Sequence, residues 1–240
     1  MVYRPTARTR ANAQQRRTSI ESAARHVIAR GGFASATVAA VAREAECSAG
    51  LIYTYYPNRD ELLRSVFARA SGHELAVIEA AVTQAGSAAA IAESVTEVFV
   101  RRAVAGRRLA HALLFEEVPD AVQLERLILR RGYVAAIAAG LDRVRGRAGD
   151  HAQTTPAEVA DAPSQTAGGA GPAAPAEVVA RFIVGGIAEN LVDVLNPSAP
   201  APSDIEALIS ALSAFTRSAL AWIFHVIAGY SGVYCMEVPL

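Results

Sequence analysis

The sequence predicts an all-α protein. Alanine is abundant throughout the 240 residues, and apolar residues recur at the three- and four-residue spacing of a helix face. Valine and isoleucine do not alternate with polar residues, as they would in half-buried strands. The chain is 52% hydrophobic and 19% charged, which excludes a disordered protein, a collagen and a disulfide-rich secreted module. We expect one or two domains with a sizeable buried core.

The first expected elements are a basic arm and a helix that ends at two glycines. Residues 1–15 are polar and rich in arginine, and we predict a flexible arm there. Residues 18–30 are predicted to form a helix, and its apolar stripe consists of Ile20, Ala23, Ala24, Val27 and Ile28. Gly31 and Gly32 end this helix, as glycine commonly does at a helix C-terminus.

Two short helices with a tight break between them are expected next. Thr37 offers a side-chain cap to a helix over 38–45, Ser48 offers one to a helix over 49–55, and a longer helix begins at Asn58. Two short helices joined by a turn and braced by a helix on each side form a helix-turn-helix. The expected inward positions are Val38, Val41, Ala42, Cys47, Ile52 and Tyr56, and the expected outward positions are Ala49, Leu51, Tyr53 and Thr54.

Beyond residue 85 the pattern predicts longer and more apolar helices. We place them at 87–105, 106–116, 121–147, 176–195 and 204–228. Residues 149–175 are rich in Ala, Gly, Pro, Ser and Thr and are predicted to be a flexible insert. The expected domain organisation is a basic arm at 1–15, a three-helix helix-turn-helix domain at 16–67, a helical domain at 68–228 and a tail at 229–240.

The net charge of zero hides an uneven distribution. Residues 1–70 hold 11 arginines against 5 acidic residues, a net charge of +6, and residues 71–240 hold 12 against 18, a net charge of −6. Only the front of the chain is therefore expected to meet a polyanion. The first twenty residues contain no apolar run of the kind found in a signal peptide. The most apolar stretch, at 219–228, has half the length that a membrane span needs. The two cysteines are too few for a disulfide framework. These features predict a cytoplasmic protein that does not enter a membrane.

The second short helix has the length of a helix that lies in the DNA major groove. It carries no Arg, Asn or Gln for a bidentate base contact, so we expect contacts with thymine methyls and hydrogen bonds from hydroxyls. Phosphate contacts are expected from helix N-termini and from the arginine-rich front. The candidate DNA-binding residues are Thr37, Arg43, Ser48, Ala49, Gly50, Leu51, Tyr53, Thr54, Tyr55 and Arg59, with Arg8, Arg10, Arg16 and Arg17 from the arm.

The order and spacing of these residues resemble the TetR family of bacterial transcriptional repressors. Residues 37–45 resemble the second helix of the family, residues 48–56 its recognition helix, and residues 58–62 the start of its fourth helix. Glu46 stands where the family usually has glycine, and Ala49 stands where a basic residue is common. If the turn needs a left-handed residue, Glu46 carries mild strain.

A single helix-turn-helix contacts few bases, so we expect a two-fold homodimer on a double-stranded DNA operator. The last two predicted helices offer the broadest apolar stripes for a four-helix bundle between protomers, and the alternative is that the same stripes form the core of one protomer. The expected interface residues are Val179, Phe182, Ile183, Gly186, Ile187, Leu208, Leu212 and Phe215.

The resemblance also implies a ligand cavity among the helices of the C-terminal domain. The candidate lining residues are Phe99, Arg102, His111, Phe115, Tyr133, Ile137 and Asn190, and core packing is the alternative for the apolar ones. The implied function is a repressor that leaves a palindromic operator when a small, largely apolar inducer of unknown identity binds. The alternative function is a helix-turn-helix protein without an inducer, either constitutive or controlled by a partner protein.

Enzyme signatures are absent from the sequence. It contains no nucleophile elbow, no HExxH, no glycine-rich phosphate loop and no paired-cysteine spacing, and its five histidines are scattered. We therefore predict no enzyme activity, no cofactor and no metal site.

Overall fold

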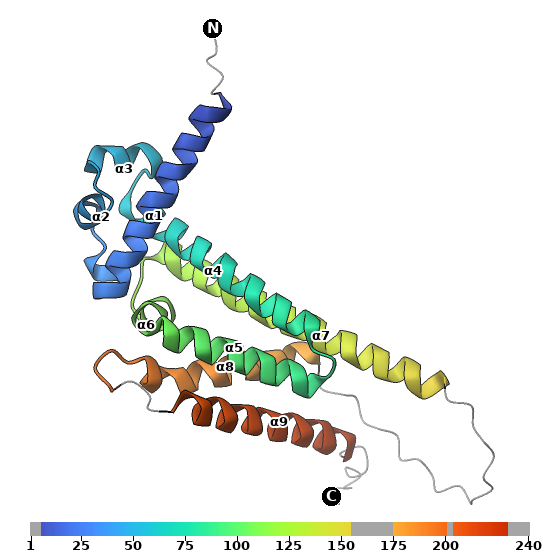
Figure 1. Cartoon of the computed structure of the whole chain (residues 1–240). Coiled ribbons are helices and arrows are strands. Elements are labelled where there is room, and N and C mark those ends of the chain that lie inside the picture. The colour runs from blue at the N-terminus through green and yellow to red at the C-terminus, as the bar shows by residue number, and fades with distance from the viewer. Residues whose placement is uncertain (1–5, 155–174, 201–203, 230–240) are drawn as a thin grey trace, which may run out of the picture. The chain divides into compact units, whose positions relative to one another are not determined.

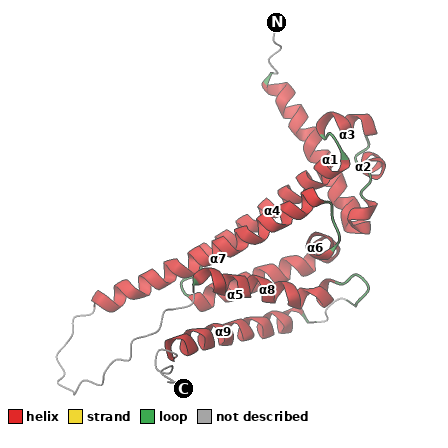
Figure 2. Ribbon diagram, turned by 180° about the vertical axis from the view of Figure 1, so that it is seen from behind, coloured by secondary structure: helices red, strands yellow, loops and turns green. Residues whose placement is uncertain are grey.

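The computed structural model describes residues 6–154, 175–200 and 204–229, and helix is the only regular secondary structure among them (Figure 2). This confirms the predicted all-α class. The helices, labelled in Figure 1, are α1 (Ala7–Ser35), α2 (Val38–Glu44), α3 (Ala49–Tyr55), α4 (Arg59–Gln84), α5 (Ala88–Ala105), α6 (Arg107–Phe115), α7 (Asp120–Thr154), α8 (Ala176–Leu195) and α9 (Ile205–Gly229). No helix in these ranges combines the length and apolarity that crossing a lipid bilayer requires.

The start of α1 differs from the prediction. The helix begins at Ala7, so the prediction of an arm is wrong for residues 7–15, and residues 1–5 lie outside the described residues. Thr6 caps the helix by accepting a hydrogen bond from the Thr9 amide at 3.2 Å. The alanines, arginines and glutamines that follow are strong helix formers, which explains why a polar segment is helical.

The far end of α7 also differs from the prediction. The helix continues to Thr154, so the predicted insert begins inside a helix. Residues 155–174 of the insert and residues 230–240 of the predicted tail lie outside the described residues. The predicted helices between residues 87 and 228 otherwise match the observed ones within a few residues at each end.

The described residues divide into two compact units. The first unit lies within Met1–Val77, Arg101–Gly132 and Ala188–Ser203, and the second lies within Ile78–Val100, Tyr133–Ile187 and Asp204–Leu240. The predicted domain boundary after residue 67 falls inside α4 and inside the first unit. The first unit thus joins α1–α3 to α6 and to parts of α4, α5, α7 and α8.

The core of the first unit brings the expected helix-turn-helix positions together. Val41, Ala42, Ile52 and Tyr56 are buried, and Val38 and Cys47 pack against them, so the predicted inward set is confirmed. The same core also takes in side chains from α1, α4, α6 and α7, namely Ile20, Ile28, Phe33, Leu62, Leu63, Phe67, Ala112 and Val122. Burial of this apolar surface fixes the two short helices, which are too short to be stable alone.

The second unit has its own buried side chains. They include Ile91 and Val95 of α5, Ile137 and Leu141 of α7, Val179 and Ile183 of α8, and Leu212 of α9. An ion pair between Arg217 of α9 and Glu93 of α5 adds a polar contact at the surface of this unit.

Candidate nucleic-acid interface

Side-chain caps set the starts of both short helices. The Ala40 amide donates to Thr37 Oγ1 at 3.1 Å, and the Leu51 amide donates to Ser48 Oγ at 3.1 Å. Each cap satisfies one of the amides that a helix start leaves without a partner. Thr37 and Ser48 are both exposed.

The turn between the two helices contains the strain that the sequence suggested. Glu46 has φ 51°, and it is the one residue other than glycine with a positive φ among those described. The Cys47 amide donates to Ala42 O at 2.9 Å and closes the turn. Because a side chain at such a φ crowds the following carbonyl, glutamate is a costly residue here.

Replacing Glu46 with glycine should therefore stabilise the protein by about 0.5–1 kcal/mol, since relief of the crowded backbone outweighs the added freedom of the unfolded chain. Urea denaturation at fixed ionic strength measures the change. The matched control is Glu46→Gln, which removes the charge and keeps the side chain. If Glu46→Gln stabilises the protein as much as Glu46→Gly, charge and not backbone strain is the cause.

The outward face of α3 is polar and solvent-exposed. Tyr53 is 54% exposed, and Ala49, Gly50 and Thr54 are exposed as well. Leu51 is half-buried at the edge of this face. Thr54 donates its hydroxyl hydrogen to Gly50 O at 3.1 Å, so its oxygen remains able to accept a hydrogen bond from a base or from water. Of the predicted outward set, Ala49, Tyr53 and Thr54 are therefore exposed and Leu51 is half-buried.

A polar network holds α3 against α1 and α4. One oxygen of the Glu21 carboxylate accepts hydrogen bonds from Tyr56 Oη at 2.9 Å and Ser65 Oγ at 2.7 Å, and the other accepts one from Arg69 Nη1 at 2.8 Å. Burial works against the charged carboxylate, but these three donors outweigh it and hold the pKa of Glu21 below its ordinary value. Burial and the nearby Glu21 raise the pKa of Tyr56, so this tyrosine stays protonated and donates.

The arginines predicted on the arm lie on a helix instead. Arg8, Arg10, Arg16 and Arg17 are exposed on α1, whose first turns project beyond α3 in Figure 1. The Arg17 guanidinium carbon lies 5.7 Å from the Tyr55 ring centroid and 5.9 Å from that of Tyr56. This stacking places a cation at the end of α3.

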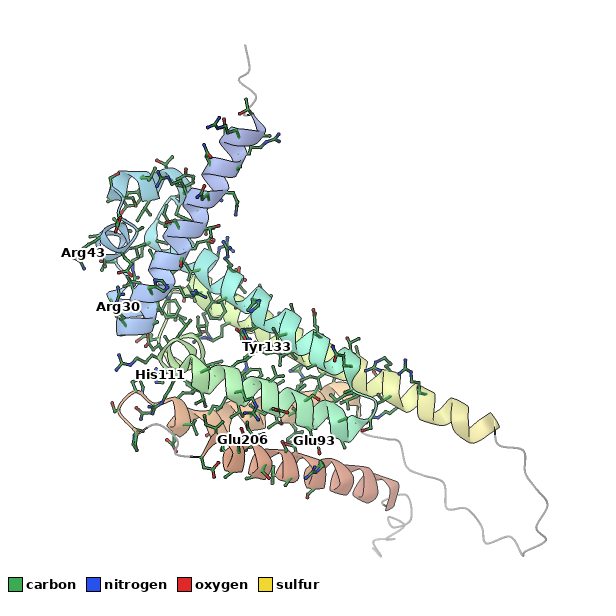
Figure 3. The ribbon with its side chains drawn as sticks, in the orientation of Figure 1. Arg30, Arg43, Glu93, His111, Tyr133 and Glu206 are labelled. Atoms are coloured by element: carbon green, nitrogen blue, oxygen red, sulfur yellow. The ribbon has the colours of Figure 1, made fainter. Side chains whose placement is uncertain are left out.

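Arg43 is exposed in the last turn of α2, whereas its neighbour Glu44 is held in an ion pair. The two oxygens of Glu44 accept hydrogen bonds from Arg30 Nη1 at 3.1 Å and Nη2 at 2.5 Å, and His26 Nδ1 lies 3.6 Å from Glu44. Arg30 and Arg43 line a shallow hollow of about 250 Å³ between α1 and α2, on the side labelled in Figure 3. Glu44 is thus held by Arg30, and Arg43 is an exposed cation beside it.

Arg59 bonds to the backbone between α1 and α2. Its Nε donates to Ala36 O at 2.9 Å and its Nη2 donates to Phe33 O at 2.5 Å, so the guanidinium holds the backbone between α1 and α2. The Nε and Nη2 groups of Arg59 thus hold two buried carbonyls, for which a planar guanidinium is well suited, and its contact with a phosphate stays a prediction.

The predicted ligand residues fall into both units. In the second unit, the Phe99 and Tyr133 rings meet edge to face with centroids 5.1 Å apart, and Ile137 is fully buried. In the first unit, the His111 and Phe115 rings lie 6.0 Å apart. Arg102 forms a two-bond ion pair with Glu74, and Asn190 is exposed on α8. The grouping of all seven residues around one ligand stays a prediction.

Thr96 is a candidate that the sequence analysis missed. It lies on α5, three residues before Phe99, and it is fully buried with no hydrogen-bond partner for its hydroxyl in the protein. Most buried hydroxyls are paired, and a helical threonine usually bonds back to a carbonyl of the preceding turn. The only signal in the sequence is the Thr96 hydroxyl among the apolar positions of this helix. It does not distinguish a ligand site, because an ordinary protein core also tolerates a threonine.

Thr96→Val should stabilise the protein by about 1 kcal/mol, because valine has the same shape and removes an unsatisfied buried hydroxyl. The change in urea midpoint measures it. Thr216→Val is the control, since the Thr216 hydroxyl donates to Leu212 O at 2.7 Å and its loss should not stabilise. A lower midpoint for Thr96→Val would show that this hydroxyl has a stabilising partner.

The predicted dimer residues divide into buried and exposed sets. Val179, Ile183, Ile187 and Leu212 are between 1% and 9% exposed and belong to the core of a single protomer, which was the alternative for these apolar stripes. Leu208 is half-buried and Gly186 is exposed. Phe182 and Phe215, in contrast, are 69% and 71% exposed, and a Cβ on Gly186 would meet no atom within 4 Å.

Two capped short helices with a polar outward face, beside a helix of exposed arginines, define a helix-turn-helix DNA-binding protein. Residues 20–66 match the family model of bacterial regulatory proteins of the tetR family. No curated protein matches the chain in sequence. The match assigns residues 20–66 to the DNA-binding domain of that family.

Solved structures share this fold over most of the chain. Salmonella enterica GusR has a TM-score of 0.63 at 17% identity and covers 88% of this chain and 96% of its own. The fatty acid degradation regulator FadR of Bacillus halodurans has a TM-score of 0.61 at 19% identity and covers 83% and 93%. FadR of Bacillus subtilis in complex with stearoyl-CoA has a TM-score of 0.57 at 18% identity and covers 86% and 97%. At these identities the likeness establishes the fold.

Proposed function

We propose that the protein is a homodimeric repressor that binds a palindromic operator and leaves it when a small, largely apolar ligand binds its C-terminal helices. The observation that carries the proposal is the outward face of α3, where Tyr53 and Thr54 are exposed on a helix whose other side is locked into the core. A surface tyrosine beside exposed small residues has no packing role in the protomer, and it suits an interface with base edges and thymine methyls.

The proposed docking uses each exposed group at a different part of the duplex. α3 enters the major groove, and the N-termini of α2 and α3 present amides and hydroxyls to the phosphates. Arg43 and the α1 arginines Arg8, Arg10, Arg16 and Arg17 reach the backbone on either side. Because no side chain makes a bidentate base contact, specificity rests partly on DNA shape and on the spacing of two half-sites.

The dimer is proposed to form through the exposed apolar side chains of α8 and α9 in the second unit. Phe182, Phe215 and Val178 are 69%, 71% and 43% exposed, and large apolar side chains at the surface mark interaction sites. Gly185 and Gly186 follow Phe182 on α8, and a Cβ at either position would meet no atom within 4 Å. These glycines allow a partner helix to approach the backbone closely.

The proposed ligand response is a shift between two populations. A ligand that prefers one arrangement of the helices changes the separation of the two recognition helices, which must match half-sites about 34 Å apart. The stearoyl chain of the ligand in the Bacillus subtilis FadR complex is apolar, as are the side chains of Phe99 and Ile137 and most of the Tyr133 ring here. The buried Thr96 hydroxyl would give such a ligand one hydrogen bond.

Selection from a random duplex library with the full chain tests the proposal. We expect enrichment of an inverted repeat, with half-site centres separated by one helical turn or a multiple of it. The Tyr53→Ala, Thr54→Ala double variant, in which two exposed side chains are shortened, should enrich no sequence under the same conditions. Failure of the unaltered chain to enrich any motif contradicts the proposed function.

A further inference from the structure

A stripe of large apolar side chains on α7 is used neither by the core nor by the proposed function. Of the eight large hydrophobic side chains exposed in the described part of the chain, Tyr53 lies on α3 and four lie on α8 and α9. The other three, Leu124, Leu127 and Ile128, are 58%, 43% and 52% exposed and have the spacing of one helix face. Single exposed apolar residues are ordinary, but a contiguous set marks a surface that meets a partner.

The contacts of the neighbouring α7 residues show that this stripe faces away from its own protomer. Val122 is buried and Leu129 packs against the core of the first unit. Glu125 accepts a hydrogen bond from Arg64 of α4 at 2.7 Å, and α4 runs beside α7 in both views (Figures 1 and 2). Arg126 donates to the end of α6. With about 100° of rotation per residue, these inner positions and the stripe lie on opposite sides of the helix.

Opposite charges lie at the two ends of the stripe. Asp120 lies one helical turn before Leu124, in the first turn of α7, and Arg131 lies one turn after Leu127. Both charged residues are exposed, and neither has an ion-pair or side-chain hydrogen-bond partner among the residues that the structure describes. The α7 stripe, defined as these four residues and Ile128, therefore consists of an acid, three aliphatic side chains and a base.

This order makes the α7 stripe complementary to a second copy of itself. In an antiparallel pair of α7 helices with a two-fold axis between Leu124 and Leu127, each Leu124 faces Leu127 of the second copy. The same register brings each Asp120 opposite Arg131 of the second copy, so both ends gain an ion pair. A parallel pair would place like charges together, which disfavours it. The charges therefore select a second copy of this chain, in one orientation, as the partner.

The α7 stripe is too small to hold two copies together on its own. A stable interface buries about 800 Å² on each partner and involves about 20 residues or more on each side. The stripe offers five side chains on one helix. Such a contact forms where another interaction already holds the two copies close together, because the effective concentration is then high. Neighbouring sites on one DNA duplex provide that proximity.

We propose that the α7 stripe joins neighbouring dimers on DNA, so that a dimer on one operator raises the affinity of the adjacent operator for another dimer. The inference rests on the proposed function, because it requires dimers that are bound to DNA. The stripe lies in the first unit and shares no residue with the proposed dimer surface of α8 and α9 in the second unit. The contact within a dimer and the contact between dimers thus use separate side chains.

The test uses duplexes that carry one or two copies of the library-selected inverted repeat, with the second copy placed at every spacing over about 20 base pairs. Quantitative gel shifts of the full chain separate complexes with one dimer from complexes with two. At spacings that recur with the helical repeat, we expect the first dimer to tighten binding of the second by about tenfold. Leu124→Asp should bind the one-site duplex as the unaltered chain does, but without cooperativity on the two-site duplex.

Charge reversal tests whether the partner is a second copy. Asp120→Arg alone places an arginine opposite Arg131 of the second copy and should abolish the cooperativity, and Arg131→Asp alone should do the same. The two substitutions together restore opposite charges in the antiparallel pair, so the double variant should bind cooperatively again. Arg130→Asp is the matched control, because it makes the same change of charge at an adjacent exposed residue outside the stripe. It should remain cooperative.

The proposal is overturned if the unaltered chain binds the two sites independently at every spacing, if Leu124→Asp stays cooperative, or if the double charge reversal restores nothing. Weaker binding of Leu124→Asp to the one-site duplex also overturns it, because the stripe would then act within one dimer. If the unaltered chain selects no duplex, the proposed function fails, and sedimentation equilibrium tests the contact without DNA. The unaltered chain should then show a further association step with a Kd of about 0.1–1 mM that Leu124→Asp lacks, and absence of this step overturns the proposal.

Discussion

Replacing Phe182 and Phe215 together with aspartate should convert the protein to a monomer and weaken binding of the library-selected duplex by about 100-fold or more. Both side chains are about 70% exposed in the protomer, so the substitutions should leave its fold intact. In a dimer, binding of one helix-turn-helix to its half-site holds the second one close to the adjacent half-site, which raises the overall affinity. Separate monomers lose this gain in affinity. Sedimentation velocity gives the mass, and fluorescence anisotropy gives the affinity.

The matched control for this experiment is Leu124→Asp. Leu124 is 58% exposed on α7, in the first unit, and lies outside the proposed dimer surface. The Leu124→Asp protein should remain a dimer with unchanged affinity for the duplex. If Leu124→Asp is a monomer, or if the double aspartate variant is still a dimer, the dimer interface does not lie at Phe182 and Phe215.

Arg59→Met should destabilise the protein by about 2–3 kcal/mol, because it leaves the carbonyls of Phe33 and Ala36 without a charged donor. Its effect on DNA binding should follow from this loss of structure. The dependence of log K on log salt should therefore keep its slope, since the Nε and Nη2 groups of Arg59 bond to these carbonyls. Urea denaturation and salt titrations of duplex binding measure the two effects.

Arg43→Ala should show the opposite pattern. Because Arg43 is exposed, its removal should leave the stability unchanged, but the loss of one phosphate contact should reduce the salt slope by about 0.9. If Arg59→Met reduces the slope and Arg43→Ala does not, the roles assigned to the two arginines are reversed.

Local sequence signals predicted the short helices well. Thr37 and Ser48 predicted the starts of α2 and α3, and the observed α3 has the predicted bounds. Glu46 in place of a usual glycine predicted the left-handed turn residue. These features depend on residues within one or two helical turns of each other, so they can be predicted from a single short segment of the sequence.

Contacts between distant segments were less predictable. Arg59 bonds to carbonyls 23 and 26 residues away, and Glu116 bonds to an amide 83 residues away, so no periodic pattern marks either contact. The apolar stripes of α8 and α9 predicted burial correctly but did not tell which partner buries them. Phe182 and Ile183 are adjacent in sequence, yet one faces solvent and the other the core of the protomer.

The most direct test of the DNA-reading face is the affinity of Tyr53→Ala for the library-selected duplex at fixed salt. Tyr53 is 54% exposed and its removal should leave the fold and the dimer intact. We expect binding to weaken by about tenfold, because a major-groove contact is lost. An unchanged anisotropy midpoint, with the dimer mass also unchanged, would contradict the placement of α3 in the major groove.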